Sequence, residues 1–245
     1  MREARSVLLR LSGPWGLILG LAALGAVALS ALGYRQGWWP LARAFAIFEY
    51  AVYAAILGFL LSAVALYRSA SHRRYGQLLL AAVGLLAASL PPAMAAHWQY
   101  AGRTTPRVND ISTDTSNPPP FLATPTRAAY PAQNAELQQA TYPDLAPLEL
   151  KLSPHDTFAA ALAVVRERDW EILAADQDEG RIEAVASSFL YGFKDEVAIR
   201  VTRSGTGGRV DLRSRSRIGR NDRGANAKRI RAFMADLARL SARHS

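Results

Sequence analysis

The pattern of hydrophobic and polar positions changes near residue 100. Before that point, three long apolar runs occupy residues 11–34, 44–67 and 75–96. The first run holds 24 residues without a charged side chain, and the second holds only Glu49, close to its start. Because a helix rises about 1.5 Å per residue, runs of this length cross about 30 Å of hydrocarbon. The sequence therefore predicts three transmembrane helices in a membrane domain of residues 1–100.

Aromatic residues and prolines mark the predicted ends of these helices. Trp38, Trp39 and Trp98 lie at the edges of the runs, where amphipathic rings prefer the membrane interface. Pro91 and Pro92 interrupt the third run close to its end. Because proline disrupts the hydrogen bonds of a helix, we expect the third helix to break there and leave the bilayer.

The first run could alternatively be a signal peptide, since Arg2, Arg5 and Arg10 precede it and small residues follow. The hydrophobic region of a signal peptide normally has about 7 to 15 residues, so the length of this run favours a spanning helix. Within the run, Gly16 and Gly20 form a face of small residues that lets another helix approach closely. That helix belongs either to the same bundle or to a second copy of the chain.

Basic residues in the short loops predict the orientation in the membrane. Six arginines precede the first run or follow the second, whereas four lie in the other two loops. The first group is Arg2, Arg5, Arg10, Arg68, Arg73 and Arg74, and the second is Arg35, Arg43, Arg103 and Arg107. This bias favours a cytoplasmic N-terminus. With three spans, residues 101–245 then lie in the periplasm of a bacterium, and the protein lies in the inner membrane.

Residues 101–147 are rich in proline and have little periodicity. They hold eight of the 13 prolines, including Pro118, Pro119 and Pro120. Proline clusters are typical of extended spacers, and we expect no helix here. Ile111 and Phe121 are more apolar than a free linker needs. We therefore predict an extended strap that packs partly on the domain that follows.

From residue 148 to 245 the pattern is typical of an α+β domain. Residues 148–152 alternate as in a strand, and Ser153, Pro154 and Asp156 then form the signature of a helix start. Strand-like runs follow at 171–175, 181–190, 196–203 and 209–218, and an amphipathic helix covers about 226–243. Short turns between the runs predict antiparallel hairpins. We expect a sheet of about five strands, with two helices covering one face and the other face partly open.

The composition excludes several kinds of chemistry. The chain has no cysteine, which excludes disulfides, thiolate metal sites and a thiol nucleophile. The four histidines lack the spacing of metal ligands, and they are His72, His97, His155 and His244. No hydrolase or phosphate-loop motif occurs. The sequence thus predicts no metal, no cofactor and no catalytic residue.

Charge is strongly polarised within the C-terminal part. Residues 101–199 carry eight basic and 15 acidic groups, whereas residues 200–245 carry 13 basic and three acidic groups. In the run 209–218, the two-residue period places Asp211, Arg213, Arg215 and Arg217 on one face. These arginines either pair with acids of neighbouring strands or bind phosphate or carboxylate groups together with Arg223. The lack of stacking aromatics and of a recognition helix disfavours nucleic acid.

Two long motifs carry a family resemblance. The first runs over residues 109–114 and 117–121, the second over 210–222 with Gly224 and 226–230, and between them lie Phe193, Asp195, Glu196 and Arg200. Over about residues 108–240 the chain resembles the domain-of-unknown-function family 1499 (DUF1499), with Glu196 where aspartate is common. The resemblance implies a membrane-tethered or exported domain that includes Asn109 and Asp110. It implies no activity, cofactor or catalytic residue.

The sequence favours a multi-pass membrane protein whose extracytoplasmic domain binds an anionic lipid, a glycan or an envelope protein. The predicted contacts are Arg213, Arg215, Arg217 and Arg223, with Asn109 and Asp110 at the rim. The alternative is an envelope hydrolase or transferase on a lipid or cell-wall substrate, with Asp110, Asp195 or Glu196 as general acid or base. That alternative requires two of these carboxylates in one cavity with the arginines.

Overall fold

The chain forms two compact units in the computed structural model, which describes residues 2–71, 75–124 and 129–243. The first unit comprises Met1–Tyr100 with Leu190–Gly192, and the second comprises Ala101–Phe189 with Phe193–Ser245. Predictions that involve His72, Arg73, Arg74 and His244 lie outside the described residues.

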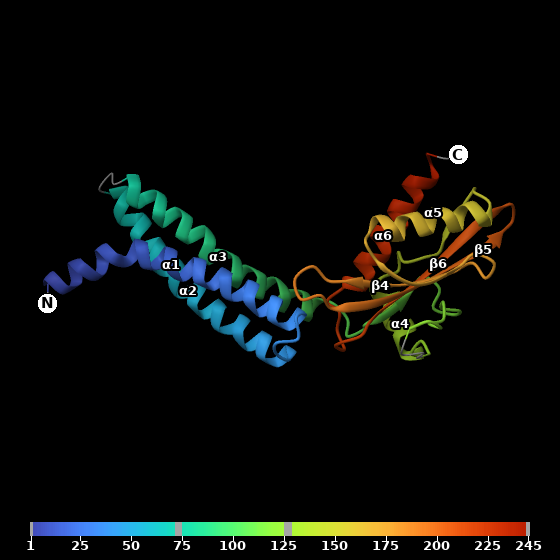
Figure 1. The fold of residues 1–245 in the computed structure, drawn as a ribbon, viewed down its shortest axis with the longest axis horizontal. Helices are drawn as coiled ribbons and strands as arrows, with labels where there is room; N and C mark the ends of the chain where they lie inside the picture. Colours follow the sequence, from blue (N-terminus) through green and yellow to red (C-terminus); the bar gives the residue numbers. More distant parts are fainter. Residues whose placement is uncertain (1, 72–74, 125–128, 244–245) are drawn as a thin grey trace. The chain divides into compact units, whose positions relative to one another are not determined.

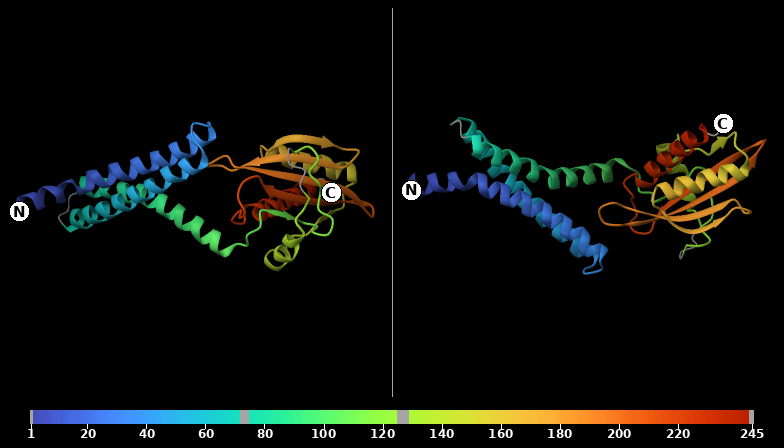
Figure 2. Two further views of the ribbon diagram at one scale, coloured as in Figure 1. Left: turned by 90° about the horizontal axis from the view of Figure 1, so that it is seen from below. Right: turned by 45° about the horizontal axis from the view of Figure 1, so that its top comes forward.

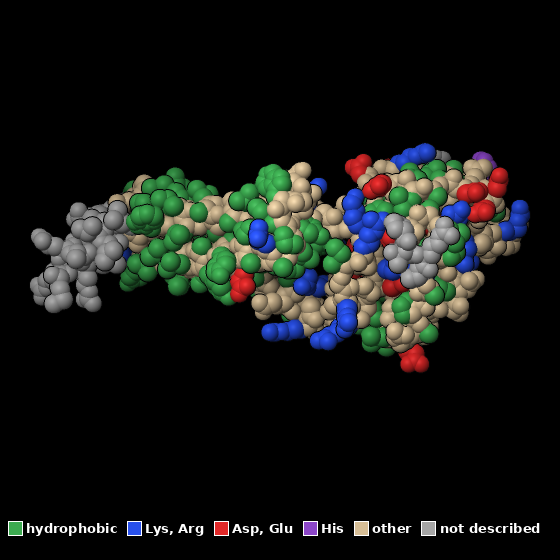
Figure 3. Space-filling view, turned by 60° about the horizontal axis from the view of Figure 1, so that its bottom comes forward, with side chains coloured by type: hydrophobic (Ala, Val, Ile, Leu, Met, Phe, Trp, Pro, Cys, Tyr) green, Lys and Arg blue, Asp and Glu red, His purple; other side chains and the backbone are tan. Residues whose placement is uncertain are grey.

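The first unit contains three long apolar helices, as predicted. Helix α1 spans Arg2–Arg35, α2 spans Leu41–Ser71 and α3 spans Tyr75–Thr104. Each helix contains a segment long and apolar enough to cross a membrane, with mean hydropathies of 2.1, 2.0 and 2.0. Hydrophobic side chains cover much of the surface of this unit (Figure 3). Such a surface is typical of helices that are solvated by lipid.

The small residues of α1 pack against its own bundle. A Cβ atom on Gly16 would lie 2.8 Å from the backbone nitrogen of Ser62 in α2. A Cβ atom on Gly20 would lie 3.0 Å from the backbone nitrogen of Ala88 in α3. The first distance is too short for a side chain and the second is tighter than most Cβ contacts, so these glycines allow the helix backbones to approach each other closely.

The predicted break in the third helix is wrong, because α3 continues through Pro91 and Pro92 to Thr104. Proline has a φ of about −65°, which a helix tolerates, although each proline removes a backbone donor at a cost of about 3 kcal/mol. The apolar surroundings favour a continuous helix because they offer no water to unpaired backbone groups.

The second unit is an α+β domain with a six-stranded antiparallel sheet, which confirms the predicted fold class. The strands are β1 (Asp110–Ser112), β2 (Leu148–Leu150), β3 (Glu171–Asp176), β4 (Arg181–Ser187), β5 (Lys194–Ser204) and β6 (Gly207–Ser216). Their order is β1-β6-β5-β4-β3, and β2 pairs with the same edge of β6 as β1 does. The short strand β1 lies in the proline-rich segment, where the sequence pattern predicted only a strap.

Two helices cover one face of the sheet, as predicted (Figures 1 and 2). They are α5 (Pro154–Glu167) and α6 (Ala225–Ser241), and Ser153 caps α5 by accepting the N–H of Asp156. Alternate residues of the strands, such as Ile199 and Leu212, are buried in one apolar core with the helices. We refer to this side of the sheet as the helix face.

Residues 113–124, which lie within the predicted strap, cover the central part of the opposite face, and this face is open around Arg200 and Arg209, in line with the expectation of a partly open face. Phe121 in this segment is only 3% exposed. The expectation of no helix in residues 101–147 is wrong, because α4 spans Ala132–Thr141 (Figure 1). This stretch has no internal proline, and six of its ten residues are alanine or glutamine, which favour helix. We call the side covered by residues 113–124 the strap face.

Candidate functional site

Buried charges line the strap face of the sheet. Four carboxylates on this face are at most 3% exposed, and they belong to Asp110, Glu183, Glu196 and Asp211. Arginines from β4, β5 and β6 surround them. Because a buried charge is costly unless it is paired, each of these acids needs a cationic or hydrogen-bonding partner close by.

Arg213 and Asp110, two of the predicted site residues, form one buried pair. Arg213 is 2% exposed, and its Nε and Nη2 atoms lie 2.9 and 2.7 Å from the two carboxylate oxygens of Asp110. The guanidinium carbon lies 4.6 Å from the ring centre of Phe121 in the strap. This two-bond geometry uses the fork of arginine for a contact inside the domain. Arg213 and Asp110 therefore hold β1 and the strap on the sheet.

Arg215 and Arg217 share the carboxylate of Glu196 on the neighbouring strand. Arg215 Nε lies 3.0 Å from Glu196 Oε2, and Arg217 Nε lies 3.0 Å from Oε1. The Arg215 side chain is 10% exposed and stacks on Phe121, whereas that of Arg217 is 35% exposed. Arg215 thus belongs to the buried layer, while Arg217 at its edge reaches the surface.

Glu183 holds the strap through its backbone. Its carboxylate accepts hydrogen bonds of 2.9–3.0 Å from the N–H groups of Leu122 and Ala123, and it also accepts one from Arg181. Sequence reasoning missed this residue, although the two-residue period of β4 places it on the same face as the arginines. Beyond Thr113, whose N–H donates to Leu212 O in β6, the strap forms no strand, so such side-chain contacts replace a backbone ladder.

The remaining predicted site residues are Arg217 and Arg223, which lie in the loop between β6 and α6, and Asn109, which bonds to it. We call residues 217–224 the arginine loop, which contains Arg217, Arg220 and Arg223. Asn109 Nδ2 donates to Gly219 O at 2.5 Å, and Asn221 Nδ2 donates to Gly102 O at 3.2 Å. The arginine loop is therefore held against β1 and against the last residues of α3. Ile218 in the loop is 50% exposed.

Asp222 joins the arginine loop to α6. Its two oxygens accept the N–H groups of Gly224 and Asn226, both at 2.8 Å, at the start of the helix. Burial raises the pKa of Asp222, and the negative charge of Asp195 raises it further, although the hydrogen bonds at the helix start oppose the shift. Arg223 has a φ of 55°, in the left-handed region that non-glycine residues seldom adopt.

The three carboxylates of the enzyme alternative are not arranged around one substrate. Asp195 lies on the helix face, where Arg229 Nη2 is 2.5 Å from its Oδ2. Asp110 and Glu196 lie on the strap face, and both are engaged by arginines there. The sheet thus separates Asp195 from the other two acids, because adjacent residues of a strand point to opposite faces.

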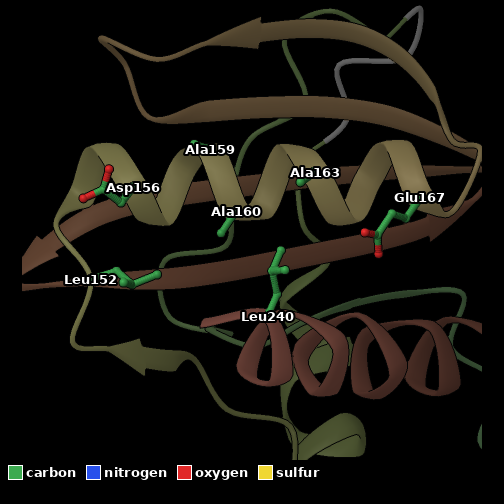
Figure 4. A pocket seen from close by; sticks show the side chains of 7 residues that line it. All are labelled: Leu152, Asp156, Ala159, Ala160, Ala163, Glu167 and Leu240. Atoms are coloured by element: carbon green, nitrogen blue, oxygen red, sulfur yellow. The ribbon is translucent and has the colours of Figure 1, made fainter. Parts of the chain in front are cut away.

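A groove of about 520 Å³ lies between α5 and α6 (Figure 4). The methyl groups of Ala159, Ala160 and Ala163 line it on one side and Leu240 lines it on the other. The lining combines small apolar side chains with Asp156 and Glu167 near the two ends of α5.

The family model described as a protein of unknown function (DUF1499) matches residues 110–237, which is just over half of the chain. The match covers every strand of the sheet, the strap, and α6 up to Leu237. No curated protein matches the chain.

Proposed function

The chain belongs to the DUF1499 family, and we propose that its extramembrane domain binds anionic lipid headgroups through the arginine loop. The hydrogen bond from Asn221 to Gly102 carries this proposal. Gly102 lies near the end of α3, directly after Trp98 and Tyr100, which are suited to a membrane interface. If α3 crosses the bilayer, this contact holds the arginine loop within reach of the headgroups.

The side chains of the arginine loop have the chemistry for such a surface. Arg217, Arg220 and Arg223 supply positive charge, and Ile218 exposes an apolar side chain between them. Each basic residue near an anionic membrane contributes about 1 kcal/mol. Asn109 fits the predicted role at the rim, because its side chain holds Gly219 in place.

We assign Arg213, Arg215 and Asp110 a different role within this proposal. The guanidinium groups of Arg213 and Arg215 are nearly buried and bind Asp110 and Glu196. A lipid phosphate would have to displace these carboxylates from a site under the strap. The three residues therefore support the sheet and the strap, and the proposal assigns the contact with lipid to Arg217, whose side chain is 35% exposed, and to Arg223 in the same loop.

The absence of cysteine allows a direct test with a single spin label. The label is placed on Ile218→Cys in the full chain, reconstituted into nanodiscs of phosphatidylcholine with or without phosphatidylglycerol. We expect anionic lipid to reduce the mobility of the label and to bring it into contact with a lipid-bound relaxation agent. High salt should reverse the effect, because surface electrostatics are screened over about 10 Å at 0.1 M salt.

Two controls sharpen this experiment. A label on Thr206→Cys, in the turn between β5 and β6 at the opposite end of the sheet, should respond to neither lipid. The combined substitutions Arg217→Gln, Arg220→Gln and Arg223→Gln should abolish the response of the label on residue 218. An equal response in neutral and anionic nanodiscs, or in the triple variant, would reject the proposal.

The proposal places the C-terminal domain in the periplasm of a bacterium, with the protein in the inner membrane. The six-to-four distribution of arginines around the helices supports this orientation. A reporter that is active only in the periplasm, fused after Ser245, should give a signal, and a reporter active only in the cytosol should not. The reverse pattern would reject the orientation and would make cytosolic anions the ligands to test.

A further inference from the structure

A second group of arginines surrounds a cavity near the turn between β5 and β6. The cavity has a volume of about 410 Å³ and is lined by Asp114, Asn117, Arg200, Thr202, Arg203, Ser204, Arg209 and Asp211. These residues come from β5, β6 and the strap. The volume is in the range of sites for small molecules, and the lining is almost entirely polar. None of these residues belongs to the arginine loop.

Positive charge exceeds negative charge in this cavity. Arg200 Nη2 lies 3.1 Å from Asp211 Oδ2, and Arg209 Nη2 lies 3.0 Å from Asp211 Oδ1. Asp114, from the strap, lies 3.0 Å from Arg209 Nη2. In the described part of the chain, Arg203 belongs to no ion pair. The residues that line this cavity thus include three arginines and two carboxylates. Outside the lining, Glu149 lies opposite Arg209 in the register of β2 and β6 and acts on its charge, and Arg203 also lines a neighbouring cavity with Asp178 and Glu179.

Arg200 and Arg209 also retain N–H groups that could bind a ligand. In the described residues, Arg200 uses only Nη2 in hydrogen bonds, and Arg209 uses Nε and Nη2. The Nη1 group of each side chain, and Nε of Arg200, therefore remain available. Because Asp211 is 1% exposed and holds both guanidinium groups, these donors are positioned before any ligand arrives.

The cavity stabilises the ionised carboxylate of Asp114. Burial opposes its ionisation, but hydrogen bonds from Ser116 and Asn117 and the charge of Arg209 lower its pKa below the ordinary value. Its Oδ1 accepts the N–H groups of Ser116 and Asn117, which leaves Oδ2 to face Arg209 and Arg200. Asp114 thus belongs to the rim of the cavity and competes with an incoming anion for Arg209.

We propose that this cavity binds the phosphate group of a small, soluble phosphate monoester. Arg200, Arg203 and Arg209 supply charged donors, and the hydroxyl groups of Thr202 and Ser204 can bond to the rest of the molecule. Several arginine donors around one point suit a phosphate, which accepts hydrogen bonds at three oxygens. Along β6, Arg209 is six residues from Arg215, which lies opposite Asp110 in the register of β1 and β6, so about 20 Å of strand separates this cavity from the start of β1. This step rests on the proposed function: with the arginine loop at the membrane, that distance favours a soluble ligand over a lipid headgroup.

The test is a calorimetric titration of the full chain in nanodiscs of phosphatidylcholine, with glycerol 3-phosphate and with inorganic phosphate. We expect saturable binding of glycerol 3-phosphate that is weakened about tenfold or more by Arg203→Gln. This substitution breaks no ion pair of the described residues, so the fold should be retained. Asp114→Asn should strengthen binding, because it removes the competing charge, and the near-ultraviolet circular dichroism of both variants should match that of the unmodified chain.

Controls separate this site from general attraction of anions. Arg166→Gln removes the same charge from the exposed surface of α5, and it should leave the affinity unchanged. The triple arginine-loop variant should also bind as the unmodified chain does, so this proposal and the lipid proposal fail separately. The absence of saturable binding, an equal loss in Arg166→Gln, or binding only to vesicles that contain phosphatidic acid would each overturn the proposal.

Discussion

The two faces of the sheet are buried by different means. On the helix face, α5 and α6 cover apolar side chains such as Leu212 and Phe233, both fully buried. On the strap face, a segment without regular structure covers paired charges such as Arg213 and Asp110. The first face gains stability from contact area, whereas the second depends on the geometry of individual hydrogen bonds.

Because of this difference, substitutions should affect the stability of the two faces differently. An apolar core loses stability in proportion to the volume removed, and its neighbours can relax around the gap. A buried ion pair gives little net stability compared with apolar residues of similar size, but loss of one partner leaves an unpaired charge. The strap face should therefore be more sensitive to single substitutions and less sensitive to matched double substitutions.

The largest expected effect is that of Arg213→Met. The substitution leaves the carboxylate of Asp110 buried without its partner, which should cost about 3–5 kcal/mol of unfolding free energy. The measurement is urea denaturation of the full chain in detergent micelles, followed by hydrogen-exchange protection of β5 and β6. Adding Asp110→Leu should recover most of the loss. If the double variant is as unstable as the single one, the pair is not the source of the effect.

The matched test on the helix face is Leu212→Ala, on the same strand as Arg213. Leu212 is fully buried in the apolar core, so the cavity should cost about 2–5 kcal/mol. The same denaturation experiment measures it. Adding Asp110→Leu should give no recovery, because that residue lies on the other face. Coupling between these two sites would show that the faces are not independent.

A smaller and local effect is expected from Glu183→Gln. The amide retains one acceptor but loses the charge that binds Leu122 and Ala123, which should cost about 1–3 kcal/mol. Limited proteolysis should then cleave residues 113–124 faster, while exchange protection of β5 and β6 changes little. Glu179→Gln, at the exposed acid that also binds Arg181, is the control. Equal cleavage in both variants would contradict the role of Glu183.

The smallest expected effect concerns pH and Asp222. Burial raises the pKa of this carboxyl above 3.8, its value in the unfolded chain, with Asp195 adding to the shift, so the folded state favours the protonated form. Its contribution to stability is then fully present below pH 3.8 and is lost as pH rises through the higher, folded-state pKa. Asp222→Asn should flatten this part of the profile. The difference in unfolding midpoint between the two chains, measured from pH 3.5 to 7, tests the sign.

Much of the architecture follows from local patterns. Three apolar runs predicted three helices that can span a membrane, and the two-residue period in residues 209–218 predicted which side chains of β6 share a face. The signature at Ser153 predicted the start of α5. These features depend on spacing within one element, so the sequence is enough to recognise them.

The candidate sites show that local sequence patterns do not predict which charged side chains become buried. The alternation in β6 placed Arg213, Arg215 and Arg217 together, but it could not distinguish an exposed face from a covered one. That distinction depends on Asp110, Phe121 and other residues about 100 positions earlier in the chain. The distinction between a covered and an exposed face divides the predicted arginines into two groups. Arg213 and Arg215 are buried partners of carboxylates, whereas Arg217 and Arg223 belong to the arginine loop.

The sequence by itself determined three apolar helices that are long enough to span a membrane, the α+β class and the side chains that share a strand face. Only the tertiary structure decided that the strap covers that face, that α3 passes through Pro91 and Pro92, and that Arg200, Arg203 and Arg209 surround one cavity. The physical reason is that periodicity reports the geometry of a single element. Burial and ion pairing depend on which distant segment arrives at its surface.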